Sequence, residues 1–204
     1  QIAFNISHGP TLNYTTIIGA VEAAIANDRI LIKSGTHLEE STITINKNLI
    51  LSSLSGQSTD VMIDGGNEFR VFVVTDNANV TMSYLTIQNG YSTGTHIGGG
   101  AIYAVNSTLI LNNVRGLSSN AQVISPGNGE GGGFLKSVST NTTILSSYFE
   151  NNLTNGTGGA IQISRAPSMI SNNIFVSNNA QNSGGAVSLW ITGFTGNSTY
   201  FTNN

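Results

Sequence analysis

Apolar and polar residues alternate along short stretches of this chain, and glycine, asparagine or serine separates one stretch from the next. Ile161–Ser164 and Val187–Leu189 alternate strictly, whereas Thr108–Leu111 and Thr142–Leu145 are short runs with β-branched and aliphatic residues. A period of two residues is typical of β-strands that bury one face. The second half of the chain is therefore predicted to consist of short strands joined by polar turns.

Two motifs repeat with one common period of 26 residues in that half. The motif Phe-x-x-Asn occurs at Phe149–Asn152, Phe175–Asn178 and Phe201–Asn204. The motif Gly-Gly-Ala, followed by an aliphatic residue, occurs at Gly99–Ile102, Gly158–Ile161 and Gly184–Val187. A degenerate copy at Gly132–Leu135 carries Phe134 in place of alanine. Repeats of this length are typical of solenoids, in which each unit buries its apolar face only against its neighbours.

The predicted fold is all-β: a right-handed parallel β-helix in which equivalent residues stack about 4.8 Å apart. Phe149, Phe175 and Phe201 are expected to form an interior aromatic stack. Asn152, Asn178 and Asn204 are expected to form an amide ladder that satisfies the backbone groups of buried turns. The glycine pairs permit backbone conformations and close approaches that a Cβ would forbid. The structural positions of that motif are Gly99, Gly100, Ala101, Gly158, Gly159, Ala160, Gly184, Gly185 and Ala186.

The first half is less regular but fits the same plan. A short amphipathic helix is predicted over Thr16–Ala26, capped by Asn13 or Thr15 and covering the open end of the coil. Strands are predicted at 29–33, 42–45, 49–52, 61–63, 71–74, 80–82 and 85–87. The whole chain, 1–204, is thus one domain: an N-terminal strand and helix (1–28), irregular rungs (29–98) and repeat rungs (99–204).

These two motifs resemble the repeats of chlamydial polymorphic outer-membrane proteins and of related microbial adhesins. The landmarks in the first half, among them Gly35–His37, Ile63–Gly66 and Val80–Gly90, resemble the leading section of such proteins. The resemblance implies a pectin-lyase-like β-helix, display on a cell surface, and a structural or adhesive role. Phe134 in the degenerate copy departs from the pattern.

Charged residues make up 8% of the chain and leave a net charge of −3. Without a run of basic residues, a nucleic-acid partner is not expected. No apolar stretch approaches the ~18 residues of a membrane span. Cysteine is absent, so disulfides do not hold the fold together. Asn-x-Ser/Thr triplets, which suit a secreted glycoprotein, occur at Asn5, Asn13, Asn79, Asn106, Asn141, Asn152, Asn155 and Asn197.

Ionisable residues are sparse where the repeats are regular. From residue 101 onward the acids are Glu130 and Glu150, and the bases are Arg115, Lys136 and Arg165. We therefore expect no catalytic residue, metal site or cofactor. The alternative is a polysaccharide lyase or glycosidase, which would need clustered carboxylates and bases.

The remaining charged segments leave few places for such a site. Asp60, Asp64, Glu68 and Arg70 form the one dense group, either a catalytic or Ca²⁺ cluster or solvated charges around a turn. His37 and Glu39-Glu40 are predicted to lie in an exposed loop.

Three non-catalytic roles follow: an extracellular adhesin or coat protein that contacts a surface glycan or protein, a filament subunit, and a glycan- or ice-binding module. Ile2, Phe4 and Ile6 alternate along residues 1–7, so this segment could dock on the open last rung of a neighbour and give head-to-tail self-association. A specific partner site is expected on the loops Gly90–Ile97 or Ser118–Glu130. A glycan- or ice-binding face is disfavoured because the column Lys136, Gln162 and Ser188, predicted to project outward, is irregular.

Overall fold

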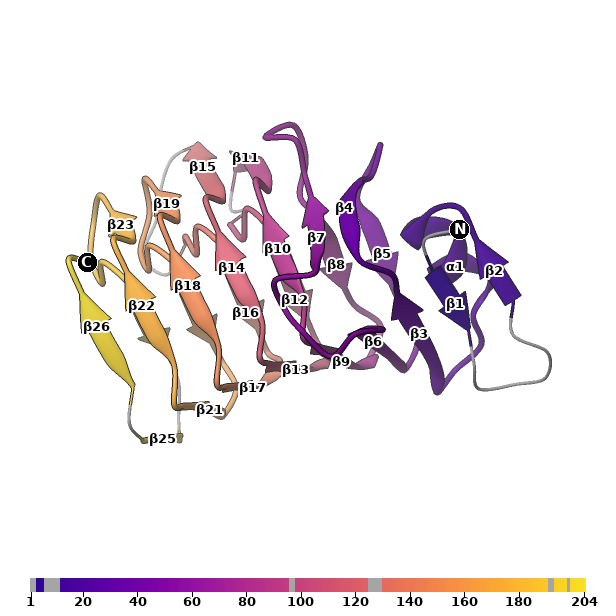
Figure 1. The fold of residues 1–204 in the computed structure, drawn as a ribbon. Coiled ribbons are helices and arrows are strands. Elements are labelled where there is room, and N and C mark those ends of the chain that lie inside the picture. The colour runs from indigo at the N-terminus through magenta and orange to yellow at the C-terminus, as the bar shows by residue number, and fades with distance from the viewer. Residues whose placement is uncertain (1–2, 6–11, 96–97, 125–129, 191–192, 198) are drawn as a thin grey trace.

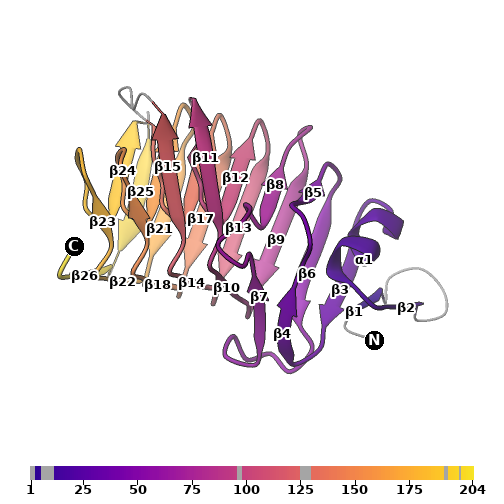
Figure 2. The same ribbon diagram turned by 90° about the horizontal axis from the view of Figure 1, so that it is seen from above.

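The chain folds into a parallel β-helix with one short N-terminal helix, which confirms the predicted fold class (Figure 1). The structure is a computed structural model. It describes residues 3–5, 12–95, 98–124, 130–190, 193–197 and 199–204. The coil advances from α1 at one end to β26 at the other, and its strands line up across the axis (Figures 1 and 2).

Four sheets, labelled A to D here, run along the coil. Sheet A contains, in spatial order, β2 (Leu12–Tyr14), β1 (Ala3–Asn5), β3 (Asp28–Ile32), β6 (Leu49–Ser53), β9 (Asn79–Ser83), β13 (Thr108–Asn112), β17 (Asn141–Leu145), β21 (Ser168–Ser171) and β25 (Phe194–Asn197). Sheet B contains β4 (Gly35–Leu38), β7 (Val61–Asp64), β10 (Thr86–Gln88), β14 (Arg115–Leu117), β18 (Tyr148–Glu150), β22 (Ile174–Val176) and β26 (Tyr200–Thr202).

The other two sheets are shorter. Sheet C contains β5 (Ile43–Ile45), β8 (Phe72–Val74), β12 (Ile102–Val105), β16 (Leu135–Val138), β20 (Ile161–Ser164) and β24 (Val187–Trp190). Sheet D contains β11 (Tyr91–Thr95), β15 (Asn120–Ile124), β19 (Leu153–Thr154) and β23 (Asn179–Ala180). From β9 onward each turn of the coil visits sheets A, B, D and C in that order.

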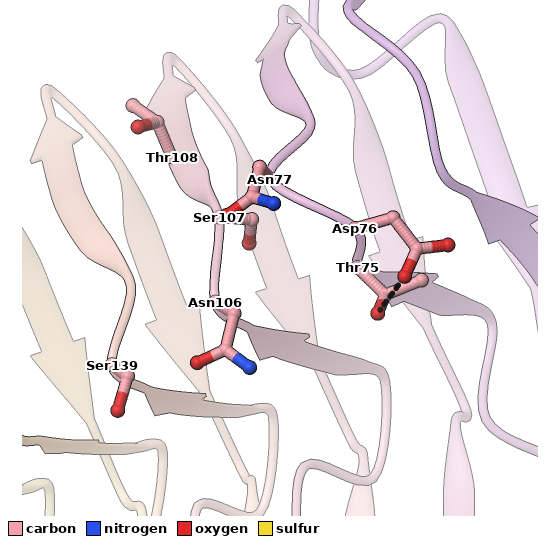
Figure 3. A pocket seen from close by; sticks show the side chains of 7 residues that line it. All are labelled: Thr75, Asp76, Asn77, Asn106, Ser107, Thr108 and Ser139. Atoms are coloured by element: carbon pink, nitrogen blue, oxygen red, sulfur yellow. Dashed lines mark hydrogen bonds between the residues drawn. The ribbon is translucent and has the colours of Figure 1, made fainter.

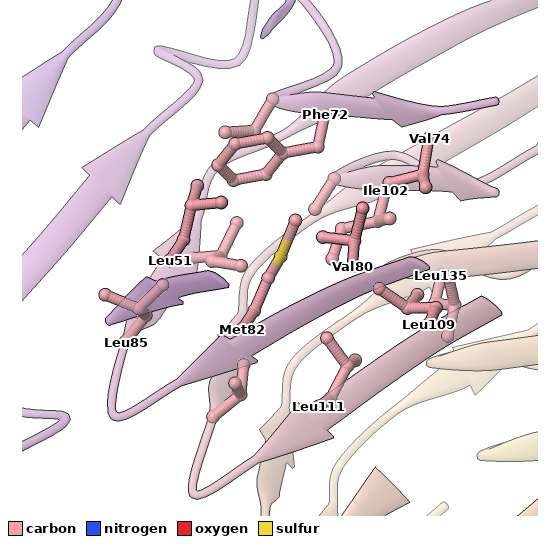
Figure 4. Close-up of a cluster of buried hydrophobic side chains, with 14 of the residues drawn as sticks. Leu51, Phe72, Val74, Val80, Met82, Leu85, Ile102, Leu109, Leu111 and Leu135 are labelled. Carbon is pink, nitrogen blue, oxygen red and sulfur yellow. The ribbon is translucent and has the colours of Figure 1, made fainter. Parts of the chain in front are cut away.

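The core is continuous from the helix to the last rungs. Figure 4 shows its middle part, where mostly aliphatic side chains such as Val80, Leu109 and Leu135 pack together. The predicted aromatic stack is confirmed: the ring centroids of Phe149 and Phe175 lie 5.0 Å apart, and those of Phe175 and Phe201 lie 5.1 Å apart. Phe149 and Phe175 are interior as predicted, whereas Phe201 is about half exposed. Burial of such columns, one rung on the next, supplies the stability that no single repeat has alone.

The predicted amide ladder is also confirmed. The Nδ2 of Asn152 donates to the Oδ1 of Asn178 at 2.9 Å, and the Nδ2 of Asn178 donates to the Oδ1 of Asn204 at 2.9 Å. Each amide also donates to a backbone carbonyl, Gly116 O for Asn152 and Phe149 O for Asn178. The buried turn between sheets B and D thus has its polar groups paired through side chains.

The glycine motif turns the chain from sheet D into sheet C. Gly99, Gly132, Gly158 and Gly184 all have φ between 67° and 74°, the left-handed region. The second glycine of the pair sits against backbone: a Cβ on Gly133 would lie 2.2 Å from Gly159 O. The first glycine is therefore needed for its left-handed backbone conformation, and the second is needed because a side chain would clash with the backbone of the next rung.

Charged side chains from neighbouring rungs hold both ends of helix α1 (Ile17–Ala23). Its N-cap is Thr16, so the predicted caps Thr15 and Asn13 were wrong by one and by three residues. The Glu39 carboxylate accepts from the backbone N–H groups of Ile17 at 3.0 Å and Ile18 at 3.1 Å. Glu39 and His37 are buried, so the prediction of an exposed loop there was wrong, because the carboxylate is needed at the helix N-terminus.

The two predicted partner loops are strands instead. Gly90–Ile97 contains β11, and Ser118–Glu130 contains β15; residues 96–97 and 125–129 lie outside the described part. The two strands pair in parallel over five positions, from Tyr91↔Asn120 to Thr95↔Ile124. The sequence did not indicate these strands, because their residues are mostly polar and lack the alternation of apolar and polar residues. Backbone hydrogen bonds between neighbouring rungs hold the two strands together.

Candidate functional site

The charged residues between Asp60 and Arg70 bond to different partners. The Asp64 carboxylate accepts from Gly66 N at 2.8 Å, from Gln88 Nε2 at 2.7 Å and from Asn89 Nδ2 at 2.9 Å. It therefore organises the turn after β7, as the interpretation of charges around a turn predicted. Among the described residues, no group of three or more His, Asp or Glu side chains is placed to hold a metal ion.

Arg70 instead joins the outside of sheet C. Its Nε and Nη2 donate to Gly99 O at 2.8 Å and to Gly98 O at 3.0 Å, and its guanidinium carbon lies 5.2 Å from the centre of the Tyr103 ring. Burial lowers the pKa of Arg70. This cation thus fixes the glycine turn of the next rung rather than completing a carboxylate cluster.

The column Lys136, Gln162 and Ser188 points away from the core, but it is covered. The three residues are neighbours in register and are only 5%, 0% and 9% exposed. This column was predicted to project outward as part of the surface, and its burial contradicts that prediction. The glycine turn lies against it, since a Cβ on Gly184 would be 3.3 Å from the Cβ of Ser188. Sheet C therefore has a second, polar buried layer outside the apolar core.

From β6 onward the outward face of sheet A, in contrast, carries no charged side chain among the described residues, and all of these residues except Ser52 are exposed or half-buried. Arg29 of β3 precedes Ile50 in the same column and marks the charged end of this face. One column along it alternates aliphatic and threonine side chains through six successive rungs: Ile50, Thr81, Ile110, Thr143, Met169 and Thr195. The other described outward residues of these strands are Ser52, Asn79, Ser83, Thr108, Asn112, Asn141, Leu145 and Ser171. We call these fourteen residues the neutral face, since none of them is ionisable.

A polar hollow of about 430 Å³ borders the neutral face at the corner between sheets C and A (Figure 3). Its lining consists of Thr75, Asp76, Asn77, Asn106, Ser107, Thr108 and Ser139. Asp76, Asn77, Asn106 and Ser139 have positive φ, so the corner is built from tight turns of non-glycine residues. Thr108 belongs to both surfaces, and the hollow extends the neutral face with hydroxyl and amide groups and with one carboxylate, that of Asp76.

The predicted glycan acceptors differ in accessibility. Asn13, Asn79, Asn106 and Asn141 are exposed, and Asn155 is half-buried with its Nδ2 bonded to Val123 O. Asn152 is fully buried in the amide ladder, so it cannot carry a glycan in this fold. The side chains of Asn5 and Asn197 lie outside the described part.

At the C-terminal end, the last rung presents apolar side chains. Phe201 is 53% exposed, and with Ile170, Val187, Leu189 and Phe194 it borders a hollow of about 400 Å³. At the other end, β1 pairs with both β2 and β3 of its own chain, so Ala3–Asn5 is already part of a sheet. Of the residues predicted to mediate assembly, Ile2, Ile6 and the side chain of Phe4 lie outside the described part.

Within the described residues, no helix combines the length and hydropathy of a membrane span. The chain matches no protein-family model, and comparisons with curated proteins and with solved structures find no match.

Proposed function

We propose that the protein is a non-catalytic, extracellular scaffold that adheres to an uncharged polysaccharide surface through the neutral face. The single observation that carries this proposal is the outward column in which aliphatic and hydroxyl side chains alternate from β6 to β25. The sequence resemblance to surface adhesins points to the same role.

The chemistry of the neutral face suits sugars better than charged polymers. Threonine, serine and asparagine side chains donate and accept hydrogen bonds, as sugar hydroxyls do. The intervening Ile50, Ile110 and Met169 offer apolar contact to the C–H groups of sugar rings. Threonines recur every second rung, roughly 10 Å apart from the ~4.8 Å strand spacing, which gives the face a regular repeat.

The size of the neutral face favours an extended surface over a protein partner. Six strands at ~4.8 Å spacing, each ~17 Å long, give an area of about 500 Å². A standard protein–protein interface takes about 800 Å² from each partner. An insoluble polymer compensates for a small contact area, because it presents many identical sites close together and so at a high effective concentration.

Sedimentation with insoluble polysaccharides tests the proposal. We expect the protein to co-sediment with cellulose, chitin or insoluble β-glucan, and Thr143→Lys to abolish this by placing a charge in the middle of the neutral face. Thr36→Lys, on the exposed face of sheet B, is the matched control and keeps binding. Binding to ice but to none of the polysaccharides would favour the ice-binding function over adhesion to a polysaccharide. Equal loss in both variants, or no binding to any of these surfaces, contradicts the proposal.

Glycosylation provides a second check, because Asn79 and Asn141 lie on the neutral face itself. A glycan on either residue would cover the contact surface. The proposal therefore expects both residues to be unmodified in material from the native source, as measured by peptide mass spectrometry. Full occupancy at Asn79 and Asn141 would exclude the neutral face as the adhesive surface.

End-to-end association is a second candidate function, favoured by the exposed apolar side chains of the last rung. A second copy that pairs with β26 and covers Phe201 would bury them. Donation of residues 1–7 would first require β1 to leave β2 and β3, so we place the contact on the C-terminal end alone. Light scattering of the protein and of Phe201→Arg tests this: concentration-dependent growth that the variant lacks supports association, and monomers in both samples exclude it.

A further inference from the structure

Two hollows follow one another along the corner between sheets C and A. The first is the polar hollow of Figure 3, whose lining lies on or beside the three successive turns before β9, β13 and β17. The second has a volume of about 420 Å³ and lies over the starts of β17, β21 and β25. Ser139 lines the first hollow and Asn141, two residues later, lines the second, so the two meet at β17. We call the two hollows together the corner groove.

The corner groove runs along the axis of the coil and crosses the strands. It passes five successive turns, those before β9, β13, β17, β21 and β25. At a spacing of ~4.8 Å between rungs, five turns give a length of about 19 Å. The units of an extended sugar chain are similar in length to one such step, so one sugar can face each turn.

The lining of the corner groove combines polar groups with an apolar end. In the first hollow, Asn77 and Asn106 are exposed and offer amide groups that can donate and accept hydrogen bonds. In the second, Pro167, Met169 and Phe194 are exposed and offer apolar contact. A sugar chain can use both kinds of surface, since its hydroxyl groups form hydrogen bonds and its C–H groups pack against apolar side chains.

The charge of the corner groove restricts the class of sugar. Of the described residues that line the two hollows, Asp76 is the only ionisable one, and its carboxylate accepts from Thr75 Oγ1 at 3.4 Å. A chain of uronic acids would place its own carboxylates beside Asp76 without a cation in the lining to balance them, and such like-charge contacts are unfavourable. The groove therefore suits a neutral chain.

Backbone hydrogen bonds between rungs hold these turns in place before any ligand binds. Asn77 N donates to Asn106 O at 2.9 Å, and Ser139 N donates to Ser164 O at 2.9 Å. A site that is already ordered avoids the entropic cost of ordering loops on binding. The corner groove is thus preformed.

We infer that the corner groove binds a single extended chain of a neutral polysaccharide, parallel to the coil axis and with one sugar facing each turn. The inference rests on the proposed adhesion to uncharged polysaccharides and adds how the polymer is held. One chain lies in the groove, and the neutral face beside it contacts the neighbouring chains of the same polymer.

Calorimetry with soluble oligosaccharides tests the corner groove with the wild-type protein alone. We expect cellohexaose or chitohexaose to bind, and the affinity to rise with chain length up to about the five sugars that the groove holds. Hexagalacturonate, a chain of uronic acids, should not bind. If neither neutral hexasaccharide binds while insoluble polysaccharide still sediments with the protein, the groove is wrong and the adhesive role stands. Binding of hexagalacturonate as tight as that of the neutral chains would also overturn the inference.

Two substitutions outside the neutral face locate the site. Thr75→Trp fills the first hollow and Pro167→Trp fills the second. Each is expected to weaken binding of the neutral hexasaccharide by roughly tenfold or more. Thr36→Trp, at an exposed position of sheet B, is the matched control and keeps the wild-type affinity. Wild-type affinity in both groove variants, or an equal loss in all three variants, contradicts the inference.

Discussion

Phe134 occupies the space that a side chain at Gly116 would need. A Cβ on Gly116 would lie 2.7 Å from Cδ2 of Phe134, and also 2.7 Å from Cδ1 of Phe149. Gly116 stands one rung before Phe149 in the aromatic column, and Phe134 packs edge-on against Phe149 with centroids 5.3 Å apart. The large residue that breaks the Gly-Gly-Ala motif thus fills the gap left where the aromatic column lacks a phenylalanine.

A double-mutant cycle measures this coupling. Phe134→Ala is expected to cost about 3–5 kcal/mol through the cavity it leaves. Gly116→Ala is expected to cost about 1–3 kcal/mol through overpacking. In the double variant the two changes compensate, so the loss is smaller than the sum of the single losses by more than ~0.5 kcal/mol. Urea denaturation measures all four free energies of unfolding, and strict additivity would show that Phe134 and Gly116 do not share the space.

The amide ladder gives the second prediction. Asn178 accepts from Asn152 and donates to Phe149 O and to Asn204. Asn178→Leu leaves several buried groups unpaired, each worth about 1–3 kcal/mol, so we expect the free energy of unfolding to fall by at least ~3 kcal/mol. Asn141→Ser, at an exposed position of sheet A, is the control and should stay within ~0.5 kcal/mol of the wild type. Similar losses in both variants would rule out a special role for the ladder.

Strict periodicity made part of the fold predictable from the sequence. The 26-residue interval is sufficient to assign Phe149, Phe175 and Phe201 to one column and their asparagines to another. A second ladder has no such signal, although Asn173 donates to Ile144 O and accepts from Ser147 N. The previous rung has Ser147 at the matching position, so no repeated letter marks this ladder.

Side chains that act across rungs were the hardest to predict. Glu39 lies 22 residues from Ile17 in the chain, and no local pattern connects a carboxylate to a helix that distant. Lys136 and Gln162 alternate with core residues as solvent-facing positions do, and only the fold of the glycine turns shows that they are covered. The neutral face was missed for the same reason, since its alternation runs from rung to rung and not along the chain.

Lys136 makes the free energy of unfolding depend on pH. Burial, and to a smaller extent Arg165 and Arg70, lower its pKa from the ordinary 10.5 against the opposing effect of Glu130. Between the lowered pKa and 10.5 the unfolded chain binds more protons than the folded one, so the free energy of unfolding rises with pH across that interval. Lys136→Met should lack this rise. Comparing the two proteins in urea at each pH cancels the titration of tyrosines, and identical pH profiles would refute the prediction.

Helix α1 depends on charges at both of its ends, and this dependence can be tested at each end separately. Glu39 accepts from two N–H groups at the N-terminus, and Lys47 Nζ donates to Ala24 O at 2.8 Å and to Val21 O at 3.2 Å at the C-terminus. Glu39→Ala and Lys47→Met should each cost about 1–2 kcal/mol, since both charges complement the helix dipole and satisfy its free backbone groups.

The exposed neighbour Glu40 provides the control for that experiment, and Glu40→Ala should change the free energy of unfolding by less than ~0.5 kcal/mol. Hydrogen exchange of the amides of Ile17 and Ile18 separates a local effect from a global one. In Glu39→Ala these amides should exchange faster than those of the central rungs, because the helix end opens while the coil stays folded. Uniformly faster exchange along the whole chain would mean that α1 and the coil unfold as one unit.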